Sequence, residues 1–123
     1  MKKISLQVIK NGRVVFESDK EWLHPLFDLE DYLRAKSITI HGAEVHDKVI
    51  GKAAALMIIR LEPGSVYGEV MSELGQSALK KAGIPYSYSK LVEHIDCLTE
   101  ELLMNEDDPE RAYKLLRQRA GRL

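Results

Sequence analysis

The residues best suited to chemistry lie in one short polar segment, Glu44 to Lys52, which runs directly into the apolar residues 53–59. Asp47, Lys48 and Lys52 stand at spacings that would place them on the first turns of one helix. A helix start carries unpaired N–H groups and a partial positive charge. An acid and two amines gathered there could bind an anion or transfer a proton, so we expect a ligand-binding or catalytic site at this position.

Each of these groups also has a purely structural interpretation. Asp47 could act as a general base or a metal ligand, but an aspartate at this position also caps its own helix. Lys48 and Lys52 could bind an anion or remain solvated charges, with Lys48 pairing with Glu44 one turn earlier. Gly51 costs a helix about 1 kcal/mol relative to alanine, which indicates close approach by a neighbouring element or by a ligand.

Two further segments could contribute to the same site. Ser72-Glu73 could position a substrate amine or hydroxyl, or it could be a helix cap followed by a first-turn acid. Cys97, the single cysteine, would have a lowered thiol pKa at a helix start and could act as a nucleophile. A lone cysteine can equally be a small buried hydrophobe. Glu100 lies one turn after Cys97 and could serve as its acid or base partner.

Metal ligation is the alternative chemistry. The candidate ligands are the four histidines, the cysteine and the carboxylates. No Cys-x-x-Cys, His-x-x-x-His or His-x-Glu pattern is present, so we expect no dedicated zinc site and no bound cofactor. An atypical zinc enzyme would have to use His46, Cys97 and carboxylates. The sequence also contains neither a glycine-rich phosphate loop nor a nucleophile elbow.

Composition limits the class of protein. The chain has 123 residues, 45% hydrophobic and 30% charged, which fits one globular domain spanning residues 1–123. A formal net charge of −1 gives no electrostatic basis for general nucleic-acid binding. One cysteine, no signal-like N-terminus and no bilayer-length apolar run favour a cytoplasmic protein without a membrane partner. We expect a small-molecule partner, with self-association into a homo-oligomer as an open alternative.

Alternating helices and strands must position these residues. Asn11-Gly12 between two β-prone runs predicts a hairpin, because both turn residues must adopt positive φ. The expected elements are a hairpin over 4–16, a helix from Pro25, a strand over 37–40, a helix over 47–60, a strand over 66–71, a helix from Ser72 to Gly83, a strand over 84–88, a helix over 97–104 and a helix from Asp108-Pro109. That alternation predicts an α/β protein, a three-layer α/β/α sandwich around one mixed sheet.

The pattern of these segments resembles a small prokaryotic family of unknown function that is grouped with the cytidine-deaminase-like fold. The resemblance covers most of the chain and is carried by three pieces of sequence. They are Asp47-Lys48-Val49-Ile50-Gly51-Lys52-Ala53-Ala54-Ala55, Val66-Tyr67 with Ser72-Glu73, and Cys97 with Glu100. It implies a cytidine-deaminase-like domain in which Asp47-Lys48 and Ser72-Glu73 lie at the helix starts that form the active edge in true deaminases.

The sequence departs from zinc deaminases at both of those places. The enzymes carry His-x-Glu (or Cys-x-Glu) and Pro-Cys-x-x-Cys there, where this chain has Asp47-Lys48-Val49 and Ser72-Glu73-Leu74. Without these ligands, no hydroxide nucleophile forms at neutral pH by the usual metal route. The sequence also departs from the family of unknown function itself. Where that family usually has Cys-Pro-x-Glu, this chain has Cys97-Leu98-Thr99-Glu100, so the proline is absent.

We therefore expect a deaminase-like domain that acts without a metal and binds a small polar, nucleotide-like ligand at the strand-to-helix edge. The candidate catalytic residues are Asp47, Lys48, Cys97 and Glu100, and the candidate ligand-binding residues are Lys52, Ser72 and Glu73. In a catalytic version Cys97 is the nucleophile or Asp47 the base, and Lys48 stabilises negative charge. A non-catalytic interaction or oligomerisation module and an atypical zinc hydrolase or deaminase remain as alternatives.

Overall fold

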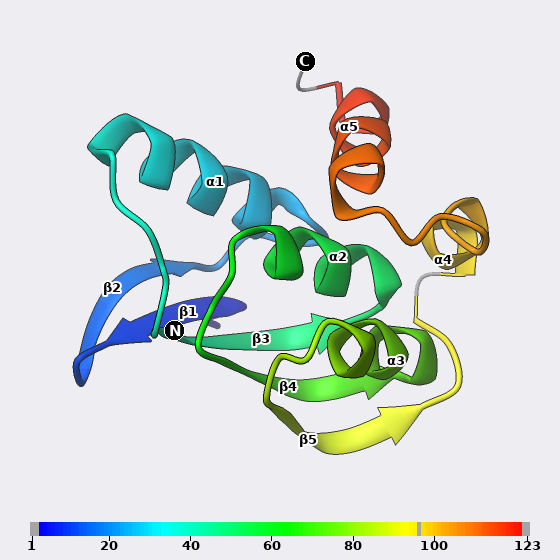
Figure 1. Cartoon of the computed structure of the whole chain (residues 1–123), viewed down its shortest axis with the longest axis horizontal. Helices are drawn as coiled ribbons and strands as arrows, with labels where there is room; N and C mark the ends of the chain where they lie inside the picture. Colours follow the sequence, from blue (N-terminus) through cyan, green and yellow to red (C-terminus); the bar gives the residue numbers. More distant parts are fainter. Residues whose placement is uncertain (1–2, 96, 122–123) are drawn as a thin grey trace.

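The structure is a computed structural model that describes residues 3–95 and 97–121, apart from the side chains of Cys97 and Leu98. Helices and strands alternate along most of the chain (Figure 1). In chain order the elements are β1 (Leu6–Lys10), β2 (Arg13–Ser18), α1 (His24–Lys36), β3 (Glu44–Ile50), α2 (Lys52–Arg60), β4 (Ser65–Ser72), α3 (Glu73–Lys81), β5 (Tyr86–Val92), α4 (Cys97–Leu102) and α5 (Pro109–Arg119).

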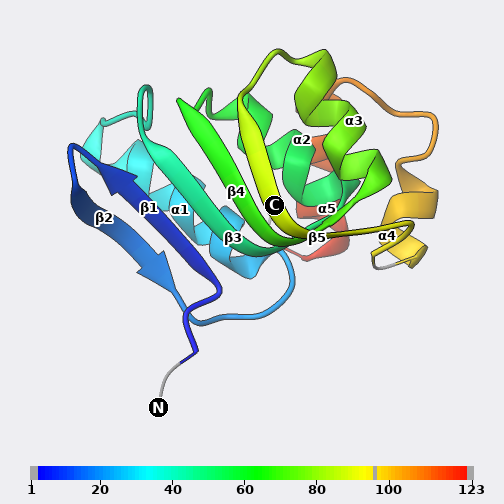
Figure 2. The same ribbon diagram turned by 90° about the horizontal axis from the view of Figure 1, so that it is seen from below.

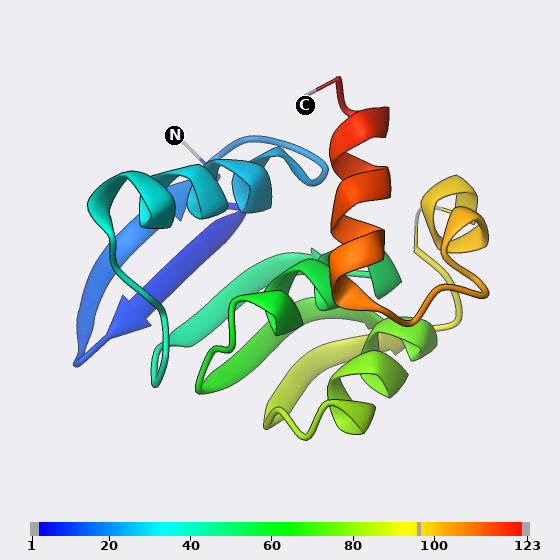
Figure 3. The ribbon, with the colours of Figure 1, turned by 45° about the horizontal axis from the view of Figure 1, so that its top comes forward.

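The strands form one mixed sheet in the order β2-β1-β3-β4-β5. β1 is antiparallel to both of its neighbours, whereas β3, β4 and β5 run parallel to one another. Helices α1, α2 and α3 lie against one face of this sheet, as Figure 2 shows. Helix α5 packs across α2 on the side away from the strands (Figure 3). The predicted α/β class and the mixed sheet are confirmed.

Several local predictions are confirmed because short-range geometry decides them. Asn11 and Gly12 adopt φ values of 54° and 76°, as the hairpin between β1 and β2 requires. Ser72 caps α3 by accepting a hydrogen bond from the backbone N–H of Gly75. Asp108 caps α5 in the same way, with Pro109 in its first turn. β5 is an edge strand, the position in a sheet that tolerates a proline such as Pro85 directly before it.

The prediction that Asp47 and Lys48 begin a helix is wrong. Both residues lie inside strand β3, and α2 begins only at Lys52, after Gly51 as its N-cap residue. Val45 is completely buried between β1 and β4, where it pairs with Val8 and Val66. Burial of a β-branched residue on a pleated sheet favours the strand here, and it outweighs the helical spacing of the polar residues.

The predicted strand at residues 37–40 is also wrong. Ser37 ends α1 in the left-handed conformation, with a φ of 54°. The residues that follow form a loop in which Ile40 is buried, so its hydrophobicity marks a packing contact and not a strand.

The hydrophobic core lies between the sheet and the helices, and its largest fully buried side chains include Phe27, Leu29 and Ile58. The spacing of Ala112, Leu115 and Leu116 predicts that they form the apolar face of α5, which is only partly correct. Ala112 and Leu116 are fully buried, but Leu115 is 39% exposed and Tyr113 takes its place. No helix in the described ranges is both long and apolar enough to cross a membrane.

Candidate functional site

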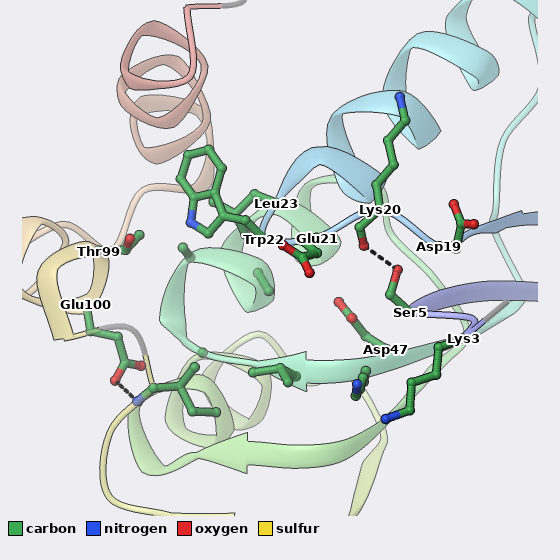
Figure 4. A pocket seen from close by; sticks show the side chains of 16 residues that line it. Lys3, Ser5, Asp19, Lys20, Glu21, Trp22, Leu23, Asp47, Thr99 and Glu100 are labelled. Atoms are coloured by element: carbon green, nitrogen blue, oxygen red, sulfur yellow. Dashed lines mark hydrogen bonds between the residues drawn. The ribbon is translucent and has the colours of Figure 1, made fainter. Parts of the chain in front are cut away.

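A cavity of about 410 Å³ opens where strand β3 ends beside the start of β1 (Figure 4). Its walls come from the start of β1, the connection between β2 and α1, the end of β3, the first turn of α2, and α4. β1 runs antiparallel to β3, so the cavity lies at the carboxyl end of β3, beside the first residues of β1. Open α/β sheets usually bind their ligands outside the carboxyl ends of their strands.

Asp47 is the acid inside this cavity. It lies on β3 opposite Leu6 of β1, and Figure 4 shows its carboxyl group directed into the open space. Burial raises the pKa of this carboxyl from 3.8 to about 7, although hydrogen bonds from the backbone N–H groups of Val49 and Lys48 act in the opposite direction. A carboxyl with a pKa near neutrality exists in both protonation states at physiological pH, which suits proton transfer.

Glu100 approaches the same region from α4, but its carboxylate is already engaged by the protein. The side chain is buried, and its Oε2 accepts hydrogen bonds from the Lys52 backbone N–H at 2.9 Å and the Ser72 hydroxyl at 2.6 Å. Its Oε1 accepts one from the Ile95 N–H at 2.9 Å. Gly51 permits this approach, because a Cβ there would lie 3.2 Å from Glu100 Oε2. The expected close approach to Gly51 is therefore made by a carboxylate of the chain itself.

The ammonium group of Lys52 is directed away from the cavity. It donates hydrogen bonds to the carbonyl oxygens of Leu103 at 2.6 Å and Met104 at 3.2 Å, and it lies 3.0 Å from an Asp107 carboxylate oxygen. Lys52 is only 4% exposed, so the positive charge of its ammonium group is balanced by the two carbonyl oxygens and the Asp107 carboxylate, and not by water.

The remaining predicted site residues are distributed differently. Lys48 lines the cavity, whereas Glu73 is exposed on α3 and does not line it. Ser72 is fully buried behind Glu100. The side chain of Cys97 lies outside the described residues, so its predicted role stays a prediction. The structure therefore brings Lys52, Ser72 and Glu100 together and places Asp47 and Lys48 at the cavity.

Sequence reasoning missed the connection between β2 and α1, which forms one side of the cavity. From the sequence alone, residues 22–25 are interpreted only as a connector to the following helix, but Trp22 and Glu21 both line the cavity. The one available signal was the single tryptophan of the chain directly after the charged run Asp19-Lys20-Glu21. An aromatic residue next to a cluster of charges outside a helix or strand is typical of binding loops.

A family model described as "TM1506: Domain of unknown function (DUF1893)" matches residues 1–120. A search of curated proteins finds no match. The chain is similar to the crystal structure of a DUF1893 family protein (TM1506) from Thermotoga maritima, with 26% identity, a TM-score of 0.85 and coverage of 94% of this chain and 80% of that one.

The chain is also similar to the apo dCMP deaminase of the cyanophage S-TIM5. The identity is 19% and the TM-score 0.57, over 70% of this chain and 79% of that chain. A similarity at this level shows a shared fold and nothing about shared activity.

The deaminase-like fold raises the question of zinc. Zinc deaminases hold the metal with His-x-Glu and Pro-Cys-x-x-Cys segments. The helix starts at the cavity belong to α2 and α4. The first reads Gly51-Lys52-Ala53 and offers no metal ligand, and the carboxylate in the first turn of α4, that of Glu100, already accepts hydrogen bonds on both oxygens. His46 does not line this cavity and packs against Tyr67 instead. Across the described residues, no three His, Cys, Asp or Glu side chains are grouped to hold a metal, so these residues do not fit zinc.

Two findings define the relationship of this chain to other proteins. The family model spans residues 1–120 of the chain, and the Thermotoga maritima structure shares its fold over 94% of the chain. The chain belongs to the DUF1893 (TM1506) family of unknown function and has a cytidine-deaminase-like fold.

Proposed function

We propose that this protein binds a small polar, nucleoside-like molecule in the cavity between the start of β1 and the end of β3, without a metal, and that Asp47 is the group that recognises it. One observation carries the proposal: a carboxyl group with a pKa of about 7 is directed into a cavity of about 410 Å³. A cavity of this size suits a small organic ligand. A perturbed carboxyl group inside such a cavity is a common mark of a functional site.

The walls of the cavity support a ligand with both apolar and polar parts. Leu23, Val49 and Ala54 provide apolar surface, while Lys48 and Asp47 provide charge or hydrogen bonds. A neutral Asp47 donates one hydrogen bond and accepts another, which matches the adjacent donor and acceptor atoms on the edge of a heterocyclic base. A ribose hydroxyl or a phosphate would then meet the polar rim.

The catalytic form of the proposal assigns different roles to the two acids. Asp47 would exchange a proton with the ligand, and the amine of Lys48 would stabilise negative charge that develops nearby. Glu100 would act as a positioning residue, because both of its carboxylate oxygens already accept hydrogen bonds from the protein. Cys97 would be the nucleophile in a covalent variant of the reaction.

The test is a calorimetric titration of the purified protein with cytidine, uridine, adenosine and guanosine, together with amide NMR spectra. We expect at least one nucleoside to bind and to shift the amide signals of residues 19–23 and 47–49. Asp47→Ala, which removes both the donor and the acceptor, should weaken that binding about tenfold, roughly the cost of one hydrogen bond.

The matched control is Glu69→Ala, which also removes a carboxyl group, at an exposed position on the neighbouring strand β4. This variant should bind like the wild type. Failure of all four nucleosides to bind would overturn the proposal, and so would amide shifts confined to regions away from the cavity.

A further inference from the structure

Trp22 is held in a backbone conformation that bulky residues rarely adopt. It lies in the turn leading into α1 with a φ of 57°, in the left-handed region. Such a conformation costs a non-glycine residue about 1 kcal/mol or more, and glycine would occupy it freely. Strain of this kind persists where the surrounding structure enforces it, and it concentrates at functional sites.

The indole of Trp22 is oriented by neighbouring rings without being buried by them. Its centroid lies 5.5 Å from the ring of His24 and 6.3 Å from that of Phe27, both in edge-on geometry. Despite these contacts, Trp22 remains 42% exposed. The chain therefore accepts backbone strain at a position where the indole is only partly used for packing.

The place of Trp22 in the cavity suggests what the indole is for. Trp22 and Asp47 both line the cavity, and in the view of Figure 4 the indole lies on the side of Thr99, with the Glu21 side chain between it and the Asp47 carboxyl group. A ligand that fills this space must offer an apolar surface to the indole and a polar edge to Asp47. Planar heteroaromatic rings meet both demands, because their faces stack on aromatic side chains and their edges form hydrogen bonds.

We infer that Trp22 is the specificity-determining residue of this cavity and that it selects ligands with a planar aromatic ring by stacking against them. This inference rests on the proposed function, because it names the class of molecule that the cavity accepts. It assigns Trp22 a role in binding that the packing of α1 does not require. Since Trp22 is the only tryptophan in the sequence, its fluorescence reports on the cavity alone.

The experiment compares the wild type with Trp22→Gly and uses cytidine, uridine, adenosine and guanosine as probes. Glycine relieves the strained conformation, so we expect the melting temperature to change little, since this gain offsets the lost ring contacts. We expect the affinity for the bound nucleoside to fall about tenfold, which is typical for loss of one base-stacking aromatic residue. Tyr88→Ser, which removes a 38% exposed aromatic ring from β5, is the control and should leave affinity unchanged.

A measurement on the unmodified protein keeps the test decisive if Trp22→Gly folds poorly. Nucleoside binding should quench the Trp22 fluorescence, with the same midpoint that calorimetry gives. Binding without quenching, or equal affinity in a folded Trp22→Gly variant, would overturn this inference and leave the proposed function standing. Absence of nucleoside binding to the wild type would overturn both.

Discussion

Lys52 and Glu100 each complete the helix that carries the other. The Lys52 backbone N–H, at the start of α2, donates to the Glu100 carboxylate, while the Lys52 ammonium group donates to the carbonyl oxygens of Leu103 and Met104 after α4. Free N–H groups at a helix start and free carbonyl groups at a helix end are the atoms that need such partners. This reciprocal arrangement attaches α4 to α2 and fixes one wall of the cavity.

Glu100→Gln should destabilise the protein by about 2 kcal/mol. An amide would present N–H donors to a site where the partners are themselves donors, leaving buried hydrogen-bonding groups unsatisfied. Urea unfolding of the variant measures the loss. Glu101→Gln changes an exposed neighbour in the same helix and should have almost no effect. Equal stability of the two variants would show that the carboxylate does not hold the helix starts together.

Lys52→Met should destabilise the protein by about 2 kcal/mol and loosen the end of α4. The substitution retains most of the side-chain volume but leaves the two carbonyl oxygens at the end of α4 without a buried donor. Amide hydrogen exchange should accelerate in residues 99–104 while the central strands stay protected. The control is Lys80→Met, which removes an exposed charge from α3. Unchanged exchange in α4 would contradict the proposed attachment.

Gly75→Ala should destabilise the protein even though alanine favours helices by about 1 kcal/mol. A Cβ at this position of α3 would lie 2.8 Å from the carbonyl oxygen of Ile50, a backbone atom that cannot rotate away. The expected net loss is about 1 to 3 kcal/mol, the usual cost of overpacking. Thermal unfolding measures it, and Ser77→Ala at an exposed position of the same helix should be neutral or slightly stabilising. A stabilised Gly75→Ala variant would show that α3 can move away from β3.

The stability of the protein should fall as pH rises between about 4 and 7. The unfolded chain ionises Asp47 near 3.8, but the folded protein keeps it protonated up to about 7, so the folded state binds the extra proton over this window. The stabilisation is complete below the lower pKa and is lost as pH passes the higher one. Asp47→Asn should remove this part of the slope. The measurement is the unfolding free energy of both proteins at several pH values. The same dependence on pH in the wild type and in Asp47→Asn would contradict the account.

Local signals in the sequence predicted much of the fold, because they depend on a few neighbouring residues. The hairpin follows from Asn11-Gly12, and the caps at Ser72 and Asp108 follow from side chains that bond their own helix starts. The predicted start of α2 is wrong because the four-residue spacing of Lys48 and Lys52 suits a helix as well as a strand end. Only pairing with β1 and β4, which involves distant residues, decides between them.

The candidate site was predictable in its residue types but not in its arrangement. Lys52 and Glu100 are 48 residues apart in sequence, so their contact depends on how α4 returns to α2. The cavity combines four stretches of chain that are far apart in sequence, and no periodic pattern in the sequence predicts that they meet. The place of Trp22 in the cavity could not be predicted from the sequence, because it depends on a backbone conformation that tryptophan rarely adopts.

The most direct test of the central claim is a carbon NMR titration of the Asp47 carboxyl group, with Asp47→Asn used to assign the signal. We predict a pKa of about 7 in the free protein and a clear displacement of that pKa when a nucleoside saturates the cavity. A pKa near the ordinary aspartate value of about 3.9, unchanged by every nucleoside, would contradict the claim that Asp47 is the recognising group of a ligand site.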